Sequence, residues 1–169
     1  MKKLLAIIVL GSLFLPAFSQ SQKKTFVGNT GVSFSFPCRP AMDRSQSVDS
    51  STVYNGECET AGITYGFILV KLMHRKANLN EAEKLTEDYL QYLNKSFNIT
   101  HSEGFQKGLR LNHDERTRGI EDHWGDDQKN KWVVNAWTNG SFIAVLYNYG
   151  KTLKEGNTDS FLQSIRFPK

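Results

Sequence analysis

The sequence has little cysteine, little proline and only a small excess of one charge sign. It holds two Cys and four Pro in 169 residues, with 21 basic and 17 acidic side chains. Two cysteines exclude a scaffold held together by several disulfides, and the composition excludes a collagen repeat, a disordered acidic tail and a protein with several membrane spans. The remaining content, 39% hydrophobic and 12% aromatic residues, is ordinary for a single globular domain.

Motifs that mark several large enzyme classes are also absent from the sequence. There is no Gly-x-Ser-x-Gly elbow of a serine hydrolase, no His-Glu-x-x-His zinc motif, no calcium loop and no glycine-rich loop for phosphate or a dinucleotide. These absences favour a protein that binds over one that catalyses. No cofactor is expected, and a hydrolase ranks third among the functions considered.

Residues 1–19 have the pattern of a secretory signal peptide. Two lysines precede an apolar run over residues 4–15, and Ala-Phe-Ser at 17–19 supplies small residues for cleavage after Ser19. As a helix, the apolar run would rise roughly 18 Å, short of the ~30 Å hydrocarbon core, so a membrane anchor is the less favoured alternative. We expect residues 20–169 to form one periplasmic or secreted domain. No Cys lies at the cleavage site, so a lipoprotein is not expected.

Cleavage would lower the net charge from +4 to +2. Lys2 and Lys3 are removed with the signal peptide, which leaves 19 basic and 17 acidic side chains. A nearly neutral domain has no long-range field that attracts nucleic acid. We therefore expect no nucleic-acid partner, and an envelope protein is the expected kind of partner.

Cys38 and Cys58 are expected to form a structural disulfide. Disulfides persist in exported proteins, and this one would close a loop of 21 residues, which would stabilise the fold by roughly 3 kcal/mol. The spacing is not the Cys-x-x-Cys of a redox pair, and no His lies nearby in the sequence. Two free thiols, or a redox or metal role, are the alternatives.

The alternation of apolar and polar residues predicts several strands. Residues 32–36 alternate strictly, residues 52–59 are expected to form a second strand, and residues 65–73 are apolar on both faces. A strand with two apolar faces is expected to be central and covered on both sides. The polar residues 20–25 and 41–51 are expected to form a frayed start and a loop.

Two helices and a hairpin complete the expected pattern. Asn78 caps an amphipathic helix that runs to Phe97, and a short helix capped by Asn157 or Thr158 lies near the end of the chain. The Asn-Gly pair at 139–140 lies between two apolar segments and predicts a type I′ hairpin, in which both central residues need positive φ. The order of these elements predicts an α+β domain with an antiparallel sheet.

Four motifs, taken in order, resemble a family of exported proteins. They are Gly-x-x-Phe-x-Phe-Pro-x-x-Pro at 31–40, Tyr-Gly-Phe at 65–67 before the helix, a long hairpin with Tyr147 near its end, and Phe-Leu-x-Ser-Ile-Arg-Phe at 161–167. This order is similar to that of the domains related to PsbP, the extrinsic protein of the oxygen-evolving complex, and to the bacterial envelope protein DcrB. The resemblance covers residues 26–167.

The resemblance implies a twisted antiparallel β-sheet flanked by helices on both faces, a PsbP-like three-layer sandwich. It also implies an accessory, assembly or recognition role, and it brings no catalytic motif to this chain. We therefore expect an exported, non-enzymatic envelope accessory or interaction module. A small-ligand or metal-binding periplasmic protein is the alternative. Fold likeness alone does not supply the function.

The densest polar segment, residues 112–127, contains the candidate metal ligands. Imidazole and carboxylate groups together suit zinc or manganese. The five candidates are His113, Asp122, His123, Asp126 and Asp127. The favoured interpretation is instead a solvated edge hairpin, whose charges discourage pairing with other strands and are nearly balanced by neighbouring basic residues.

Aromatic residues are frequent towards the end of the chain, at Trp124, Trp132, Trp137, Tyr147 and Tyr149. Most of them are expected in the core. Any that point outward beyond the helices would form a recognition surface, because Trp and Tyr dominate binding hot spots.

Overall fold

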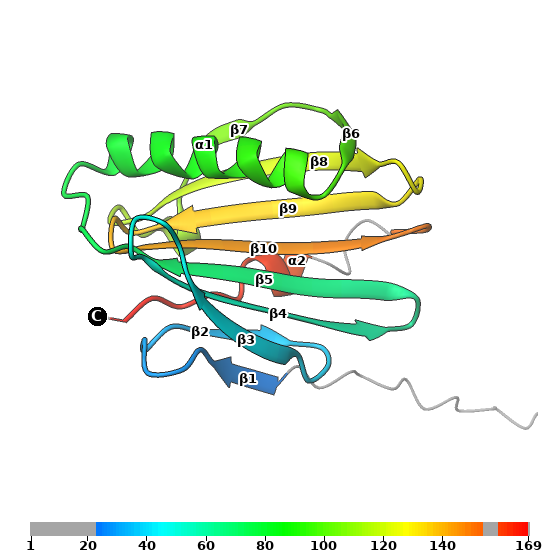
Figure 1. The fold of residues 1–169 in the computed structure, drawn as a ribbon, viewed down its shortest axis with the longest axis horizontal. Helices are drawn as coiled ribbons and strands as arrows, with labels where there is room; N and C mark the ends of the chain where they lie inside the picture. The colour runs from blue at the N-terminus through cyan, green and yellow to red at the C-terminus, as the bar shows by residue number, and fades with distance from the viewer. Residues whose placement is uncertain (1–22, 154–158, 169) are drawn as a thin grey trace, which may run out of the picture.

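The computed structural model describes residues 23–153 and 159–168 of the chain. In this part, one eight-stranded antiparallel sheet has the order β3-β4-β5-β10-β9-β8-β6, with β7 also paired to β8, and β1 and β2 form a separate ribbon (Figure 1). The strands are β1 (Lys23–Phe26), β2 (Ser33–Phe36), β3 (Ala41–Gln46), β4 (Thr52–Thr60), β5 (Ile63–Lys71), β6 (Ile99–Ser102), β7 (Gln106–Leu109), β8 (Arg118–Asp126), β9 (Lys131–Thr138) and β10 (Phe142–Gly150). The helices are α1 (Leu79–Ser96) and α2 (Asp159–Leu162), and a 3-10 turn spans Leu111–His113.

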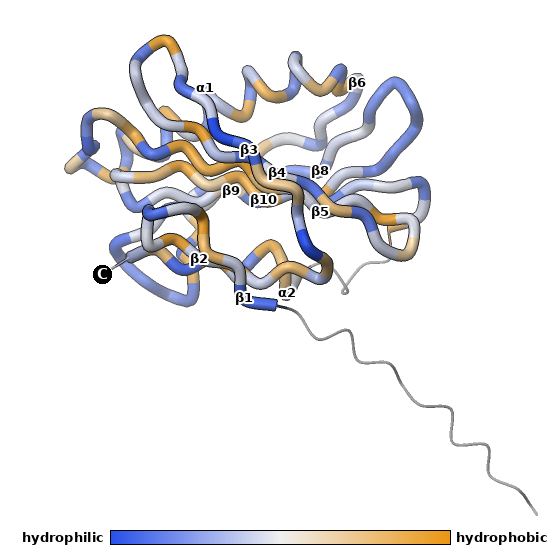
Figure 2. The backbone as a smooth tube through the Cα atoms, turned by 60° about the horizontal axis from the view of Figure 1, so that its bottom comes forward, coloured by the Kyte–Doolittle hydropathy of each residue, from blue (hydrophilic) through white to orange (hydrophobic). Residues whose placement is uncertain are grey.

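The two central strands, β5 and β10, are apolar on both faces and buried on both. Phe67 and Leu69 point to one core, while Ile68 and Val70 point to the other. The prediction that the strand expected at residues 65–73 is central and covered on both sides is therefore confirmed by β5. Hydrophobic residues concentrate in the middle of the sheet and hydrophilic ones in the surrounding loops (Figure 2).

Helix α1 covers part of one face, which we call the helix face. It lies over β8 and β9, and its buried residues Ala82, Thr86, Leu90 and Leu93 recur at helical spacing. The side chain of Asn78 caps the helix by accepting a hydrogen bond from the backbone N–H of Asn80 at 2.9 Å. The predicted cap and amphipathic helix are thus confirmed.

The opposite face, the ribbon face, is covered mainly by strands. The rings of Phe34 and Phe67 lie 4.5 Å apart, and those of Phe36 and Phe161 lie 4.7 Å apart, so the β1–β2 ribbon and the one-turn helix α2 pack together against β5. Backbone hydrogen bonds between Ser33 and Arg166 hold the C-terminal tail beside the ribbon.

The prediction of helices on both faces is therefore wrong. The molecule is a β-rich sandwich in which, among the described residues, α1 is the only helix longer than four residues. Two apolar faces on a strand require cover on both sides, but they do not specify what provides it. Here Phe34 and Phe36 of a short ribbon supply the apolar surface that the three-layer interpretation assigned to a helix.

Two further elements differ from the expectation. Residues 41–46 form the strand β3 rather than a loop, and residues 23–26 form β1 rather than a frayed start. All six residues of β3 are exposed, so no apolar alternation marks this edge strand in the sequence. The expected signal peptide and the cap residues 157–158 lie outside the described residues.

The type I′ turn predicted at Asn139–Gly140 is found instead between β4 and β5. Ala61 and Gly62, which join β4 to β5, both have positive φ and form the two-residue turn typical of type I′. At the Asn139–Gly140 turn only Gly140 has positive φ, and four residues lie between the paired Thr138 and Ile143, so the connection is not a two-residue turn. The hairpin is confirmed, and its predicted turn type is wrong.

Cys38 and Cys58 form the expected disulfide, with their Cα atoms 6.0 Å apart. The bond ties the segment after β2 to the C-terminal part of β4. A disulfide is consistent with an oxidising, exported compartment. No helix within residues 23–153 or 159–168 has both the length and the apolar character needed to cross a membrane.

Candidate functional site

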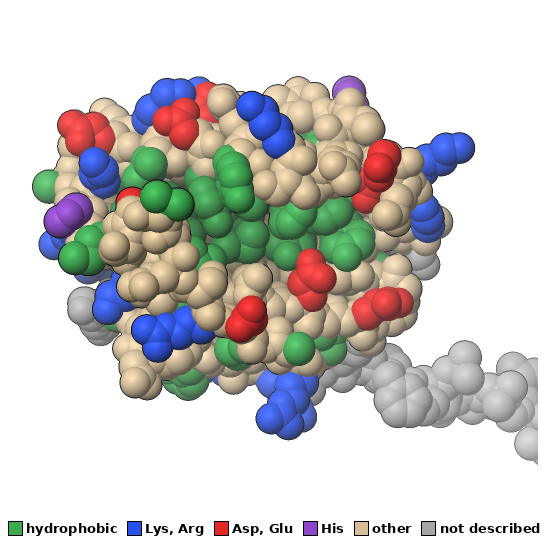
Figure 3. Space-filling model, viewed as in Figure 1, with side chains coloured by type: hydrophobic (Ala, Val, Ile, Leu, Met, Phe, Trp, Pro, Cys, Tyr) green, Lys and Arg blue, Asp and Glu red, His purple; other side chains and the backbone are tan. Residues whose placement is uncertain are grey.

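Beside α1, the part of the helix face formed by β4, β5 and β10 carries a band of hydrophobic side chains, and most of those from β5 and β10 are buried. Figure 3 shows this band between α1 and the strands β3 and β4. Cross-strand register assigns its residues, because paired residues point to the same side of a sheet. The apolar band consists of Val53 of β4, Ile68, Val70 and Leu72 beside and along β5, Ile143, Val145, Tyr147 and Tyr149 of β10, and Leu85, Tyr89 and Tyr92 of α1. The residues Ile68, Val70, Ile143, Val145 and Tyr147 are buried and form the base of the band. Its accessible surface comes from the half-buried or exposed side chains, which are Val53, Leu72, Leu85, Tyr89, Tyr92 and Tyr149.

The helix contributes a stripe of side chains that line the band. Leu85, Tyr89 and Tyr92 follow one another at spacings of four and three residues, so they share one side of α1. Tyr92 is 62% exposed, and its ring stacks on that of Tyr89 at 6.0 Å. Burial, helped by Tyr92, raises the pKa of Tyr89 to about 12, so this phenol stays protonated at physiological pH.

Aromatic rings form the end of the band farthest from the β9–β10 turn. Trp132 and Tyr149 stack with ring centroids 4.0 Å apart, and Phe97 stacks on the same indole at 5.3 Å. The Tyr147 hydroxyl donates a 2.7 Å hydrogen bond to Glu57, and burial, with a contribution from that carboxylate, raises the pKa of Tyr147. This end therefore combines a rigid aromatic surface with an exposed carboxylate.

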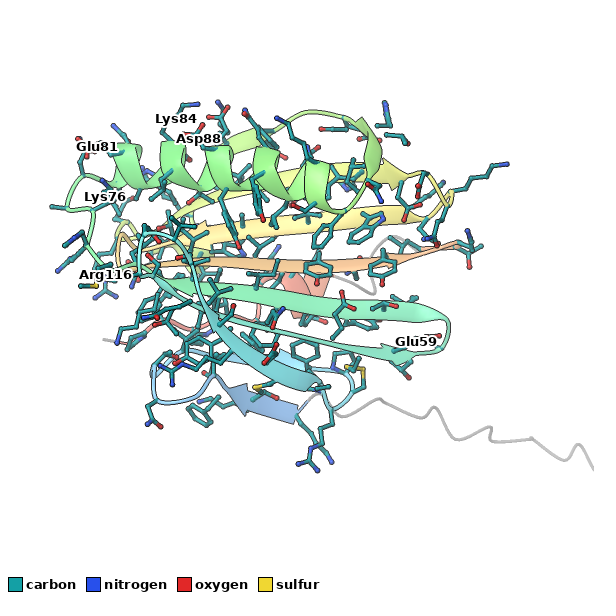
Figure 4. All side chains as sticks on the ribbon, in the orientation of Figure 1. Glu59, Lys76, Glu81, Lys84, Asp88 and Arg116 are labelled. Atoms are coloured by element: carbon teal, nitrogen blue, oxygen red, sulfur yellow. A yellow bond between two sulfur atoms is a disulfide. The ribbon has the colours of Figure 1, made fainter. Side chains whose placement is uncertain are left out.

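The charged residues on the helix face of β3, β4, β5 and β10 are all acidic. Register places Asp43, Glu57 and Glu59 on the helix face of β3 and β4, and no Lys or Arg shares that face on β3, β4, β5 or β10. Acidic side chains line the lower edge of the band in Figure 3, and Figure 4 marks Glu59 at its end. Among the described residues, these three carboxylates take part in no salt bridge.

The local negative potential also affects a tyrosine of the band. Burial raises the pKa of Tyr149, a hydrogen bond involving Thr64 opposes the rise, and the charges of Glu57, Asp126 and Glu59 add to it. An anionic phenolate would be disfavoured beside these acids, and a cation would be favoured for the same reason.

Two of the five candidate metal ligands are structural carboxylates on the helix face. Asp122 is 1% exposed and accepts hydrogen bonds from Ser102, Gly104, its neighbour His123 and the indole of Trp124. These donors leave the carboxylate fully paired.

Asp126 has a similar structural role near the β8–β9 turn. It accepts bonds from the backbone and side chain of Asn130 and from the Trp132 indole at 2.8–2.9 Å. Burial alone would raise the pKa of Asp126, but these hydrogen bonds outweigh it and the pKa is lowered.

The other three candidates lie apart from this pair. His123 alternates to the ribbon face of β8, 3.8 Å from the exposed Glu103. His113 lies in the 3-10 turn at the opposite end of the molecule, and Asp127 is exposed in the β8–β9 turn. Within the described residues, no group of three or more His, Cys, Asp or Glu side chains is placed to hold a metal ion.

The acidic edge of the band was missed by the sequence analysis. Val53, Asn55, Glu57 and Glu59 alternate along the predicted strand at 52–59, and this period-2 pattern places all four on one face. The alternation could be read from the sequence. That it forms the acidic edge of an apolar band follows only from the pairing of this strand with β3 on one side and β5 on the other.

No family model matches the sequence, and no curated protein matches it either. The resemblance to PsbP and DcrB therefore stays a prediction.

Proposed function

We propose that the protein is an exported, non-enzymatic binding module of the cell envelope, and that the apolar band takes a basic polypeptide segment of a partner protein. The observation that carries the proposal is the pairing of an aromatic, apolar surface with charges of one sign. Asp43, Glu57 and Glu59 lie on the same side as the band, and within the described strands β3, β4, β5 and β10 no Lys or Arg shares that face.

The physical argument rests on complementarity. Exposed tyrosines such as Tyr92 supply large contact area at low conformational cost, as in interface hot spots. Carboxylates at the rim favour a cationic partner and disfavour an anionic one, chiefly through the association rate and specificity. The disulfide fits a partner met in an oxidising compartment.

The experiment compares two synthetic peptides on the oxidised protein. One alternates lysine with valine and tyrosine, and the other carries glutamate in place of each lysine. We expect the lysine peptide to shift the NMR signals of Val53, Tyr92 and Tyr149, with an affinity that falls as salt is added. The glutamate peptide should bind much more weakly.

Two double variants with equal charge loss complete the test. Glu57→Gln with Glu59→Gln keeps a hydrogen-bond acceptor for Tyr147 and should weaken the lysine peptide by about fivefold. Glu103→Gln with Asp127→Asn, both outside the band, should leave the affinity unchanged. Equal effects of the two pairs, or equal binding of the two peptides, would show that the band does not select a cationic segment.

A further inference from the structure

A second feature, unconnected with the band's charge pattern, lies at the end of the molecule where α1 begins. A cleft of about 990 Å³ opens there between the loop that precedes α1, the turn at 111–117, the β9–β10 turn and the C-terminal tail. Figure 4 places Arg116 and Lys76 at this end. A cleft of this size falls in the range that takes small organic ligands.

Hydrogen bonds fix each wall of the cleft in place. The backbone N–H of Lys76 donates to Gly140 at 2.7 Å, and a Cβ at Gly140 would come within 2.1 Å of the Lys76 carbonyl, so this contact requires glycine. The Thr117 hydroxyl accepts from the Leu111 N–H at 3.0 Å and closes the turn that contains Asn112. The tail is held by the paired Ser33 and Arg166 backbones. The cleft is therefore largely preformed.

The turn at 111–117 also holds an unusual backbone. Asn112 and His113 both have positive φ, at 50° and 61°. Two consecutive left-handed residues other than glycine are uncommon and are maintained only where the surrounding structure imposes them. Here the bonds to Leu111 and Thr117 impose them, and Asn112 borders the cleft as a result.

The charge balance of the lining is positive. Both acidic residues of the lining form salt bridges with arginines. Asp114 forms a bidentate pair with Arg116 at 2.8–2.9 Å, and Glu115 pairs with Arg110. The Arg116 guanidinium holds the pKa of Asp114 at about 2, so the carboxylate stays ionised and paired. These pairings leave the remaining arginines of the lining without a carboxylate.

Those arginines are Arg75 and Arg166. Arg75 is exposed and makes no ion pair within the described part of the chain. Arg166 lies between this cleft and a second hollow lined by Gln163 and Ser164, and one of its nitrogens donates to the carbonyls of Gln163 and Ile165. A guanidinium presents several donors in a planar fork that matches carboxylate and phosphate oxygens. Both therefore retain donors for an anionic group.

Part of the cleft lining is apolar. Leu79, Phe142 and Phe167 form this part, and the two phenyl rings stack at 6.1 Å. We propose that the cleft binds an amphipathic organic anion, whose carboxylate or phosphate group contacts Arg75 and Arg166 and whose apolar part lies against Leu79, Phe142 and Phe167.

Four probes separate the requirements for charge and for an apolar part. Octanoate and octyl phosphate carry both, acetate carries only the charge, and octyltrimethylammonium carries a similar tail with the opposite charge. We expect the two amphipathic anions to shift the NMR signals of residues 111–117 and 139–142, and the relative affinities of octanoate and octyl phosphate identify the preferred head group. Acetate and the cation should produce no saturable shift there. Binding of the cation equal to that of octanoate would overturn the proposal.

A matched pair of variants locates the site. Arg75→Gln removes an exposed guanidinium that no described contact uses, so the fold is retained, and we expect the affinity for the tighter-binding anion to fall about tenfold. Arg39→Gln removes the same charge from an exposed position outside the cleft and should change nothing. Equal losses in the two variants, or no loss in Arg75→Gln, would overturn the proposal, because the anion would then respond to net charge or lie elsewhere.

Discussion

Asp122 and Asp127 are five residues apart in the sequence and were candidates for the same metal site, yet their surroundings differ completely. Asp122 is 1% exposed and collects four donors from three segments of the chain. Asp127 is exposed in a turn. Asp122 therefore holds β6, the following loop and β8 together, whereas Asp127 contributes only surface charge.

Replacing Asp122 by alanine should destabilise the fold by about 3 kcal/mol, because buried donors lose a charged acceptor. Asp127→Ala should change the free energy of unfolding by less than about 0.5 kcal/mol. Urea denaturation of both variants measures the difference. Similar small losses in the two would show that the Asp122 network contributes little to stability.

Asp114 allows a direct test of an ion pair in the wall of the cleft. Its carboxyl should titrate near pH 2 in an NMR experiment, because the bonds from Arg116 favour the ionised form. The folded-state pKa is depressed below the unfolded value of about 3.9, so the stabilising effect is present above that pH and is lost as the pH falls towards 2.

Arg116→Gln is the informative change for this titration. It removes the largest cause of the shift and leaves the backbone bond from residue 116, so the Asp114 pKa should rise part of the way to its ordinary value. A midpoint that stays near 2 in the variant would show that Arg116 does not hold the carboxylate.

At the scale of elements, two cross-strand pairs set an aromatic ring over a glycine. Gly66 of β5 pairs with Tyr147 of β10, and Gly119 of β8 pairs with Trp137 of β9. A Cβ would lie 2.3 Å from the Tyr147 ring in the first pair and 2.2 Å from the Trp137 ring in the second. Each glycine therefore gives its partner ring room to lie flat across the neighbouring strand.

Gly66→Ala should destabilise the protein by about 2 kcal/mol, because the methyl group forces the Tyr147 ring and its bond to Glu57 to move. Gly125→Ala is the matched control in β8, where the added Cβ makes an ordinary contact at 3.7 Å. There the substitution should be neutral or slightly stabilising, because alanine has less freedom in the unfolded chain. Equal unfolding midpoints in urea for the two variants would contradict this account.

The elements that could be predicted from the sequence are those in which the spacing of apolar residues indicates which faces are buried. The strand at 65–73 is apolar on both faces, and the helix after Asn78 has a cap and one apolar side, so both were found. The strand β3 is exposed along its whole length and has no such pattern. The turn at Asn139 departs from type I′ because its side chain accepts bonds from the backbones of Ser141 and Phe142.

The candidate surfaces depend on contacts between segments far apart in the chain, and the sequence alone could not place them. The acids of the band become one group only when β3 pairs with β4, and the cleft draws its walls from four segments between Arg75 and Pro168. The small net charge excluded a long-range field, but it concealed an acidic side and a basic end on the same molecule. Net charge constrains encounter at a distance, whereas local charge governs docking.

Across the whole molecule, burial predicts a graded resistance to local opening. Strand β10 has eight buried residues of nine and lies between β5 and β9, whereas all six residues of β3 are exposed and β3 pairs on one side only within the described residues. Opening β10 requires both cores to separate, so its amides should exchange with solvent only by global unfolding. The hydrogen-bonded amides of β3 should exchange through a smaller opening.

Native-state hydrogen exchange at increasing urea concentration measures this difference. The exchange free energies of β10 amides should fall with urea at the slope of global unfolding, while those of β3 should be lower and nearly independent of urea at low concentrations. A partner segment bound to the band beside β3 would then raise the protection of β3 first. If free β3 were as protected as β10, its edge would already be stabilised without a partner, and the graded account would be wrong.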